Sequence, residues 1–372
     1  MRGAWHPLLV RCARLRPRAE DAEETDRLAK ACDDWDDLIR QAELHGLTPL
    51  VRRHLDAADA HLPKRVARAL GACTARHRLT NEVRFRVLGQ ILRILESARI
   101  PVVVLKGPSL AALVYGDVGL RPMRDLDLLV PRRDADRAQS VLQQHDFAIV
   151  EECRGAVPLD HHLTPLSTES EGVHVVVEIH RQVFGDINRA TLELEETAHE
   201  EWLTFDAHGM RARALGPAQM LWHLCHHLVD LYQPIRLISV VDVVASAERF
   251  AEVLDWRRIA NDYPVVAGTL ALLDELVPLP PSVAPHARAR RPGRSRDVGV
   301  DYTGWPRRIA RAGCAGRLTD RVRDTLRPPE WWLRLYYDAD VAASRWRLML
   351  RHARAICGAA ARRVKARAST SL

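Results

Sequence analysis

Long hydrophobic runs and cysteine motifs are both missing from this sequence. No uninterrupted apolar stretch reaches about 18 residues, so no transmembrane helix is predicted. The apolar stretch from Leu8 to Val10 is too short for a secretory signal. The seven cysteines include no Cys-x-x-Cys pair, which argues against both a disulfide framework and a zinc knuckle. We therefore expect a cytoplasmic protein.

Three further signatures are absent: an internal repeat, the glycine spacing of a Walker A loop, and an aromatic-rich basic motif of the kind that binds nucleic acid. Nucleic acid is therefore not an expected partner. The chain does have 47% apolar residues beside 28% charged ones. That balance predicts a folded globular protein whose 372 residues make two or three compact units.

Positive charge gathers at the C-terminal end. From Arg288 onward there are 21 Lys or Arg and 7 Asp or Glu, a charge of +14, which leaves −7 for the rest of the chain. Residues 341–367 carry eight Lys or Arg, no acid, and apolar side chains such as Trp346 and Leu350. This pattern predicts a basic amphipathic helix that docks on an anionic membrane surface, which would make the protein membrane-peripheral. A solvated helix on the core is the open alternative.

Hydrophobic periodicity divides the chain into five consecutive segments. A helical period runs through 1–99, short β-branched strands alternate with helices over 100–215, and the helical period returns over 216–277. Residues 278–300 are rich in proline and arginine and are predicted to be a linker, followed by a basic helical region over 301–372. The predicted fold class is α+β, with a small mixed-sheet core flanked by N-terminal and C-terminal helical sections.

Within the core, apolar and β-branched runs predict individual strands, and helical spacing predicts two helices. The pattern of residues 202–215 predicts a short hairpin. The predicted strands lie at 100–105, 126–130, 147–152 and 173–179, and the predicted helices at 108–115 and 134–144.

Asp125 and Asp127 stand two positions apart on one predicted strand. Side chains alternate across a strand, so both carboxylates leave the same face. The strand is otherwise apolar, and two unpaired carboxylates there would be costly without a cation. Carboxylate oxygens are ligands for magnesium, which completes its shell with water and phosphate. We interpret the pair as a magnesium site, with a solvated strand edge as the alternative.

Basic and acidic residues on either side of this pair fit a phosphate-handling site. Upstream, Lys106 lies at a strand-turn-helix junction, where helix amides and a lysine can hold phosphate, and Arg121 could reach a triphosphate. Downstream, Glu178 and His180 share one strand face. A third acid beside bound metal can orient the ion and accept a proton from an attacking group. A charge on an edge strand is the plainer interpretation of Glu178.

The order of strand, Lys-Gly, helix, Arg-x-x-x-Asp-x-Asp and a strand with Glu-x-His resembles an uncharacterised bacterial nucleotidyltransferase family of the polymerase-beta-like superfamily. The resemblance extends over about residues 30–260, including the stretches 45–49 and 221–227. It implies a magnesium-dependent enzyme that transfers a nucleoside monophosphate from a nucleoside triphosphate to an unidentified hydroxyl or phosphate acceptor and releases pyrophosphate. The acceptor could be a small molecule, a sugar phosphate, a peptide or a protein.

The resemblance also implies roles for individual residues. Asp125, Asp127 and Glu178 would be catalytic and would bind metal, with two magnesium ions expected. The nucleotide-binding residues would be Lys106, Gly107, Ser109 and Arg121. The wider superfamily has Gly-Ser or Gly-Gly where this chain has Lys-Gly.

Two alternatives stay open. His223 and His227 are four residues apart on a predicted helix, a spacing that could ligate zinc, although no third ligand is visible. We favour packing, or an acceptor pocket that also includes His180. For the whole chain, the competing hypothesis is a non-catalytic nucleotide-binding or scaffold protein that retains the fold.

Overall fold

The computed structural model describes residues 7–153, 161–184, 191–228, 236–288, 326–328, 330–337, 339 and 343–370. Contacts divide the chain into two units, each made of separate stretches of sequence. The first unit comprises Met1–Asn81, Leu110–Pro122 and His227–Arg317. The second comprises Glu82–Ser109, Met123–His226 and Leu318–Leu372. The five segments expected from the sequence follow hydrophobic periodicity and composition along the chain, so their boundaries differ from those of the contact-based units.

The described elements of the first unit are helices. They are α1 (Pro7–Arg11), η1 (Ala19–Asp21), α2 (Ala22–Lys30), α3 (Trp35–His45), α4 (Thr48–Ala57), the first part of α5 (Lys64–Ser97), the π-helical turn η2 (Ala111–Tyr115), α9 (Leu237–Arg249), α10 (Trp256–Asp262), α11 (Pro264–Leu276) and α12 (Ala284–Arg288). Helix α3 shows why the boundaries fall where they do. The Asp34 carboxylate accepts from the amide of Asp37 at its start, and Gly46 ends it with φ +68°, a conformation that glycine adopts freely.

The second unit contains a mixed five-stranded sheet in the order β1-β2-β5-β4-β3 and a separate hairpin of β6 and β7. Strands β2 and β5 pair in parallel, and the other neighbours in the sheet are antiparallel. The strands are β1 (Val103–Val104), β2 (Asp125–Leu129), β3 (Ala148–Ile149), β4 (Leu166–Ser170), β5 (Val173–His180), β6 (Leu203–Ala207) and β7 (Met210–Ala214). The helices are the last part of α5, α6 (Lys106–Leu110, ending in the first unit), η3 (Arg132–Asp134), α7 (Ala135–Gln143), η4 (Glu151–Cys153), η5 (Leu194–Glu196), η6 (His199–Glu201), α8 (Pro217–Leu228, ending in the first unit), α14 (Glu330–Tyr336) and α15 (Arg345–Thr370).

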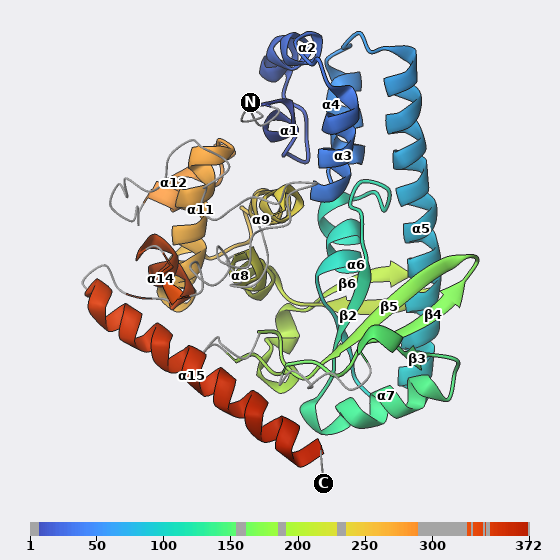
Figure 1. The fold of residues 1–372 in the computed structure, drawn as a ribbon, viewed down its shortest axis with the longest axis vertical. Helices are drawn as coiled ribbons and strands as arrows, with labels where there is room; N and C mark the ends of the chain where they lie inside the picture. Colours follow the sequence, from blue (N-terminus) through green and yellow to red (C-terminus); the bar gives the residue numbers. More distant parts are fainter. Residues whose placement is uncertain are drawn as a thin grey trace. The chain divides into compact units, whose positions relative to one another are not determined.

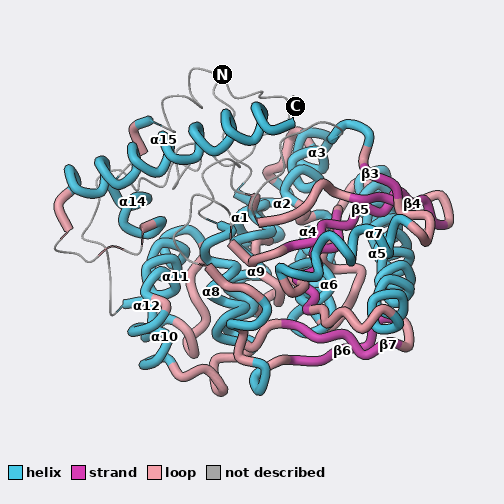
Figure 2. The backbone as a smooth tube through the Cα atoms, turned by 90° about the horizontal axis from the view of Figure 1, so that it is seen from below, coloured by secondary structure: helices cyan, strands magenta, loops and turns pink. Residues whose placement is uncertain are grey.

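The two central strands have one apolar face and one polar face. Leu126, Leu128, Val177 and Ile179 alternate along β2 and β5 and are almost fully buried. Helix α7 packs against β5, and the C-terminal part of α5 lies against the strands (Figures 1 and 2). The core of the second unit is therefore on this side, and the opposite face of the same strands carries the acidic residues.

Several boundaries differ from the sequence predictions. The strand predicted at 100–105 pairs only over Val103–Val104, and the one predicted at 147–152 only over Ala148–Ile149. The predicted linker at 278–300 includes helix α12 as far as Arg288, and residues 289–325 lie outside the described residues. The basic helix predicted at 341–367 corresponds to α15, which starts at Arg345. Residues 341–342 are not among the described residues. No helix among the described residues is long and apolar enough to cross a membrane.

Candidate active site

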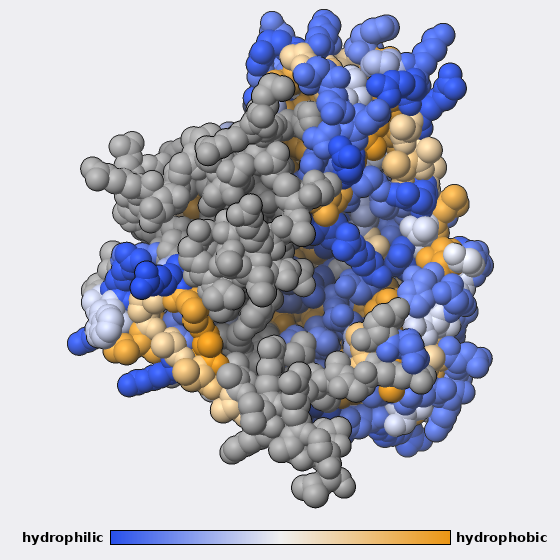
Figure 3. Space-filling model, viewed as in Figure 1, coloured by the Kyte–Doolittle hydropathy of each residue, from blue (hydrophilic) through white to orange (hydrophobic). Residues whose placement is uncertain are grey.

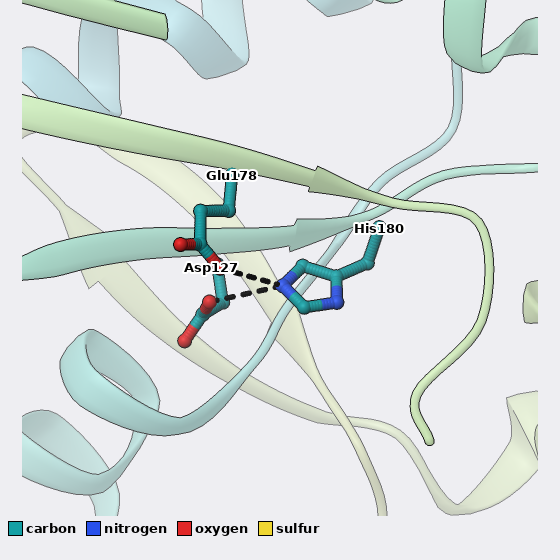
Figure 4. Close-up of side chains that lie close together, drawn as sticks. All are labelled: Asp127, Glu178 and His180. Atoms are coloured by element: carbon teal, nitrogen blue, oxygen red, sulfur yellow. Dashed lines mark hydrogen bonds and ion pairs between the residues drawn. The ribbon is translucent and has the colours of Figure 1, made fainter. Parts of the chain in front are cut away.

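The site is built on the parallel pair of strands β2 and β5. Their register places Asp127 opposite Glu178 and Leu129 opposite His180. Because side chains alternate along each strand, Asp127, Glu178 and His180 share the polar face. Figure 4 shows the two carboxylates and the imidazole ring pointing toward one another from the two strands. A pairing between residues about fifty positions apart in sequence thus brings the third acid beside the Asp-x-Asp motif.

His180 links the two acids. Its Nε2 lies 3.0 Å from Asp127 Oδ1 and 3.5 Å from Glu178 Oε2. Ligand atoms of all three residues lie within 4.8 Å of one another, a grouping that could hold a metal ion. Asp127 and His180 are buried, whereas 24% of the Glu178 side chain is exposed. Asp127 and His180 therefore form the closed end of the group, and Glu178 is its accessible member.

Lys106 approaches Asp127 from the end of β1. The amide of Leu105 donates to the carbonyl of Asp127 at 2.9 Å, and Lys106 Nζ lies 3.2 Å from Asp127 Oδ2. Lys106 has φ +39°, in the left-handed region that costs a residue with a side chain roughly 1–3 kcal/mol. At this strand-to-helix turn it is Lys106, and not the adjacent Gly107, that adopts a positive φ. The strained turn directs the ammonium group at the buried acid.

Ser109 is buried in the turn that follows. Its hydroxyl donates to the carbonyl of Lys106 at 2.8 Å, a bond that closes the first turn of α6. The structure thus uses this hydroxyl to hold the backbone of Lys106. Its predicted contact with a nucleotide stays a prediction, as does that of Gly107.

The charged residues of the site stabilise one another's ionised forms. Burial alone would raise the pKa of Asp127, but the Lys106 charge and the His180 hydrogen bond outweigh it and hold that pKa well below its usual range. Burial likewise opposes the charge of Lys106 and of His180, and the neighbouring carboxylates outweigh it, so the pKa values of both are raised. At neutral pH the site therefore contains a carboxylate at Asp127 and an ammonium at Lys106.

Asp125 sits two positions earlier on the same face, half-buried, and is not among the three residues whose ligand atoms cluster. The positive charge of Arg84, on α5, interacts with it. The Nε of Arg84 is buried and makes no hydrogen bond within the described part of the chain. Sequence reasoning missed Arg84, because a single arginine within a long helical period carries no signal of its own.

Arg121 forms an ion pair with Asp242 within the first unit. Its Nε and Nη2 donate to the two carboxylate oxygens of Asp242 at 2.9 and 2.8 Å, and the Tyr115 hydroxyl donates to the same carboxylate at 2.7 Å. Both members of the ion pair are largely buried, with 12% and 4% of their side chains exposed. This bidentate arrangement gives Arg121 a structural role that the sequence did not predict, and its predicted contact with triphosphate stays a prediction.

We expect Arg121→Lys to lower the free energy of unfolding by about 2 kcal/mol, because a lysine keeps the charge but cannot make both charge-assisted hydrogen bonds. Chemical denaturation monitored by circular dichroism measures this loss. Arg124→Lys, at an exposed neighbouring position, is the matched control and should change stability little. Equal stability of both variants would contradict a structural role for the Arg121–Asp242 pair.

The helix α8 histidines differ from one another. His223 is buried and its ring lies 6.1 Å from that of Phe184, whereas His227 is exposed. Within the described ranges, the residues grouped closely enough to hold a metal are Asp127, Glu178 and His180, so zinc at α8 gains no support. A role for His223 or His227 in an acceptor pocket stays a prediction.

His226, on the same helix, is expected to make the stability of the protein depend on pH. Burial lowers its pKa to about 4. A histidine held neutral in the folded state contributes stability above its unfolded pKa of about 6.5, and that stability is lost as pH falls toward 4. We expect a loss of about 2 kcal/mol between pH 7.5 and pH 5 that is absent from His226→Phe. Denaturation curves at both pH values test this, and a wild-type loss retained in full by the variant would contradict it.

Two further histidines that the sequence analysis did not single out stand beside the site. His162 forms an antiparallel bridge with His180, and the His161 and His162 rings lie 6.0 and 5.4 Å from the His180 ring. The amide of Leu163 donates to the carbonyl of Ile179, which fixes this segment along the end of β5. The adjacent histidine pair was visible in the sequence, but nothing local indicated that it would join His180.

Acids opposed on two parallel strands, with a lysine at the adjoining strand-to-helix turn, fit an enzyme that handles phosphate esters and a divalent cation. The chain belongs to the family described as uncharacterised nucleotidyltransferase, whose model matches residues 31–263. The resemblance recognised from the order of motifs is thereby confirmed. Membership supports a role in nucleotidyl transfer.

Two solved structures are similar to parts of the chain. An antigenic nucleotidyltransferase-like protein from Paracoccidioides brasiliensis matches at 15% identity and a TM-score of 0.37, covering 55% of this chain and 92% of that one. The antibiotic-resistance factor ANT(2'')-Ia matches at 13% identity and a TM-score of 0.34, covering 52% and 95%. The fold of this chain is defined by its own strand order, β1-β2-β5-β4-β3. A search of the curated proteins found no match.

Proposed function

We propose that the protein transfers a nucleoside monophosphate from a nucleoside triphosphate to a hydroxyl or phosphate acceptor and releases pyrophosphate. The observation that carries this proposal is the convergence of Asp127 and Glu178 on one strand face, with Lys106 3.2 Å from Asp127. Family membership supports the reaction class. Like charges at this spacing repel, so the pair is favourable only with cations beside it.

The reaction is a displacement at the α-phosphorus. The acceptor oxygen forms a bond to the α-phosphorus, and the bond to the oxygen that bridges the α- and β-phosphorus atoms breaks. Glu178, the accessible acid, takes the proton from an acceptor hydroxyl. Lys106, and Arg84 beside Asp125, supply positive charge toward the triphosphate.

The residues present fit a divalent cation. Asp125 and Asp127 leave one strand face, and the buried carboxylate of Asp127 is ionised and already surrounded by cationic groups. We propose that these two acids hold the magnesium carried by the triphosphate, in keeping with magnesium's preference for carboxylate and phosphate oxygens. Such an ion, when bound, polarises the phosphoryl oxygens and neutralises charge on the leaving pyrophosphate.

A labelling experiment tests the transfer. The protein is incubated with each triphosphate, labelled at the α- or at the γ-phosphorus, together with magnesium and fractionated cell extract. A product that retains the α-label and not the γ-label supports nucleotidyl transfer, and separation of that product identifies whether the acceptor is a small molecule, sugar phosphate, peptide or protein. Binding of triphosphate without any labelled product across all fractions favours the non-catalytic nucleotide-binding or scaffold alternative.

A second, independent activity is proposed for α15: docking on an anionic membrane surface. Trp346 and Leu350 are 71% and 40% exposed and lie one turn apart, while Leu348 and His352 face inward. The His352 ring is 2.8 Å from the Tyr337 hydroxyl next to α14, which fixes the helix orientation. Where Figure 3 colours this helix, hydrophobic atoms lie beside hydrophilic ones. Exposed apolar residues on a helix without acids are typical of interfacial helices.

We expect the double variant Trp346→Ser, Leu350→Ser to sediment with anionic phosphatidylserine vesicles about tenfold less than wild type, because two apolar side chains no longer leave water. Leu79→Ser, at another exposed apolar position, is the matched control and should sediment like wild type. Equal sedimentation of all three proteins would favour the solvated-helix alternative.

A further inference from the structure

Asp127, Glu178 and His180 offer two oxygens and one imidazole nitrogen to a single point. Their ligand atoms lie within 4.8 Å of one another. Two ligands about 2.1 Å from one ion can be at most about 4.2 Å apart, so shifts of a few tenths of an ångström would bring all three to one ion. Asp125 is not part of this group. The preformed cluster therefore differs from the all-oxygen site that the sequence suggested.

The His180 ring is held so that Nε2 is the atom aimed at the acids. His180 is the last residue of β5, its carbonyl accepts from the amide of Val130, and His162 bridges it on the other side. The ring is buried, and its Nδ1 makes no hydrogen bond to the described residues. Among the described residues, the hydrogen-bond and ion-pair contacts of this ring therefore run through Nε2 to Asp127 and Glu178 (Figure 4).

The charge balance suits an ion that gains from a nitrogen ligand. Lys106 lies against Asp127 Oδ2, and an ion at Oδ1 would replace the hydrogen bond between Oδ1 and His180 Nε2. With the imidazole neutral, as a metal ligand must be, two carboxylates and one ammonium give a net charge of −1. Magnesium prefers oxygen ligands and keeps several waters, so a buried imidazole nitrogen suits it poorly. Imidazole is a good ligand for first-row transition ions, and their affinity rises when nitrogen replaces oxygen.

We propose that Asp127, Glu178 and His180 form a binding site selective for a divalent first-row transition ion, with His180 Nε2 as a ligand. This site shares the Asp127 carboxylate with the magnesium that enters with the triphosphate and differs from it by the nitrogen ligand. This inference rests on the proposed function only because both use Asp127 and Glu178. The ion itself binds without nucleotide or acceptor. It makes His180 a metal ligand, where the sequence had suggested an acceptor pocket.

The test uses the full chain, free of nucleotide, with Mn²⁺ as the probe in the presence of excess Mg²⁺. Pulsed electron paramagnetic resonance detects nitrogen bound to Mn²⁺. We expect one Mn²⁺ per chain, with a nitrogen coupling that changes when the protein is labelled with ¹⁵N-histidine. His180→Gln should lose that coupling and weaken Mn²⁺ binding by about 10–100-fold. His174→Gln, the same substitution at an exposed position of the same strand, should keep both.

Three results would overturn the proposal: no Mn²⁺ bound against excess Mg²⁺, bound Mn²⁺ without a histidine coupling, or a coupling that His180→Gln retains. If His180→Gln does not fold, the ¹⁵N-histidine label on wild type still decides whether a histidine binds. His161→Gln and His162→Gln then decide which one, since each should retain the coupling. A protein that shows the histidine coupling but transfers no nucleotide would contradict the transfer proposal alone. A protein that transfers nucleotide but shows no histidine coupling would contradict the proposed metal site alone.

Discussion

Asp127→Asn is expected to abolish both magnesium-dependent triphosphate binding and nucleotidyl transfer while leaving the fold intact. Asp127 is the acid on which the other site residues converge, with His180 at Oδ1 and Lys106 at Oδ2. Asparagine keeps the shape but removes the charge, so it can no longer hold a cation against phosphate. The Lys106 ammonium still has the charges of Asp125 and Glu178 nearby, which limits the cost of the change to folding.

Isothermal titration calorimetry with magnesium and each triphosphate measures the binding, and a thermal melt measures the fold. Asp136→Asn is the matched control: it makes the same change in the same unit, at a side chain that is 79% exposed and paired with Arg181 at the surface. Such pairs contribute about 0–1 kcal/mol, so the control should bind and melt like wild type. Unchanged affinity for magnesium-triphosphate in Asp127→Asn would show that the metal-site assignment is wrong.

The sequence predicted the two central strands correctly because their pattern is strong. The runs at 126–130 and 173–179 are rich in branched apolar residues and are bounded by Pro131 and by a turn, and they form β2 and β5 within one or two residues. Alternation along each strand then predicted which residues share a face. That much depends on local geometry alone, so no knowledge of the tertiary structure was needed.

Strand β4 was missed for a physical reason. Its residues Leu166–Ser170 include only one buried apolar side chain, because it lies near the edge of the sheet and its other positions are partly exposed. The available signal was the turn that joins it to β5, where Glu171 and Gly172 both have positive φ, at +49° and +73°. Two such residues between antiparallel strands are typical of a tight hairpin, and glycine at the second position favours it.

The composition of the site could be predicted only in part. The sequence indicated Asp127, Glu178 and Lys106 as members, but their proximity depends on pairing between distant segments: β1 with β2 and β2 with β5. The register of such pairs is set by tertiary packing. For the same reason, the sequence did not indicate that Arg121 would pair with Asp242, or that His180 would bond both acids.

Asp127 and Glu178 have different roles in the proposed reaction because they differ in accessibility. Asp127 is buried and already surrounded by cationic groups, so its proton is lost at any pH near neutrality and it cannot exchange protons with an acceptor. Glu178 is partly exposed and stands across the strand pair from it. A group that receives a proton must be reachable by the substrate. The two acids thus suit different tasks, Asp127 for binding the cation and Glu178 for the acceptor.

Glu178→Gln should accordingly reduce transfer by about 100-fold or more while triphosphate affinity stays near normal, the usual scale for losing a general base. Glutamine keeps the size and removes the proton-accepting charge, and the loss appears only when the acceptor's proton moves. Steady-state transfer to the acceptor found by α-labelling gives the rate, and calorimetry gives the affinity. Glu169→Gln, on neighbouring β4 and 67% exposed, is the matched control and should transfer at the normal rate. Wild-type transfer by Glu178→Gln would contradict the assignment, and a loss confined to triphosphate affinity would instead place Glu178 with the nucleotide-binding groups.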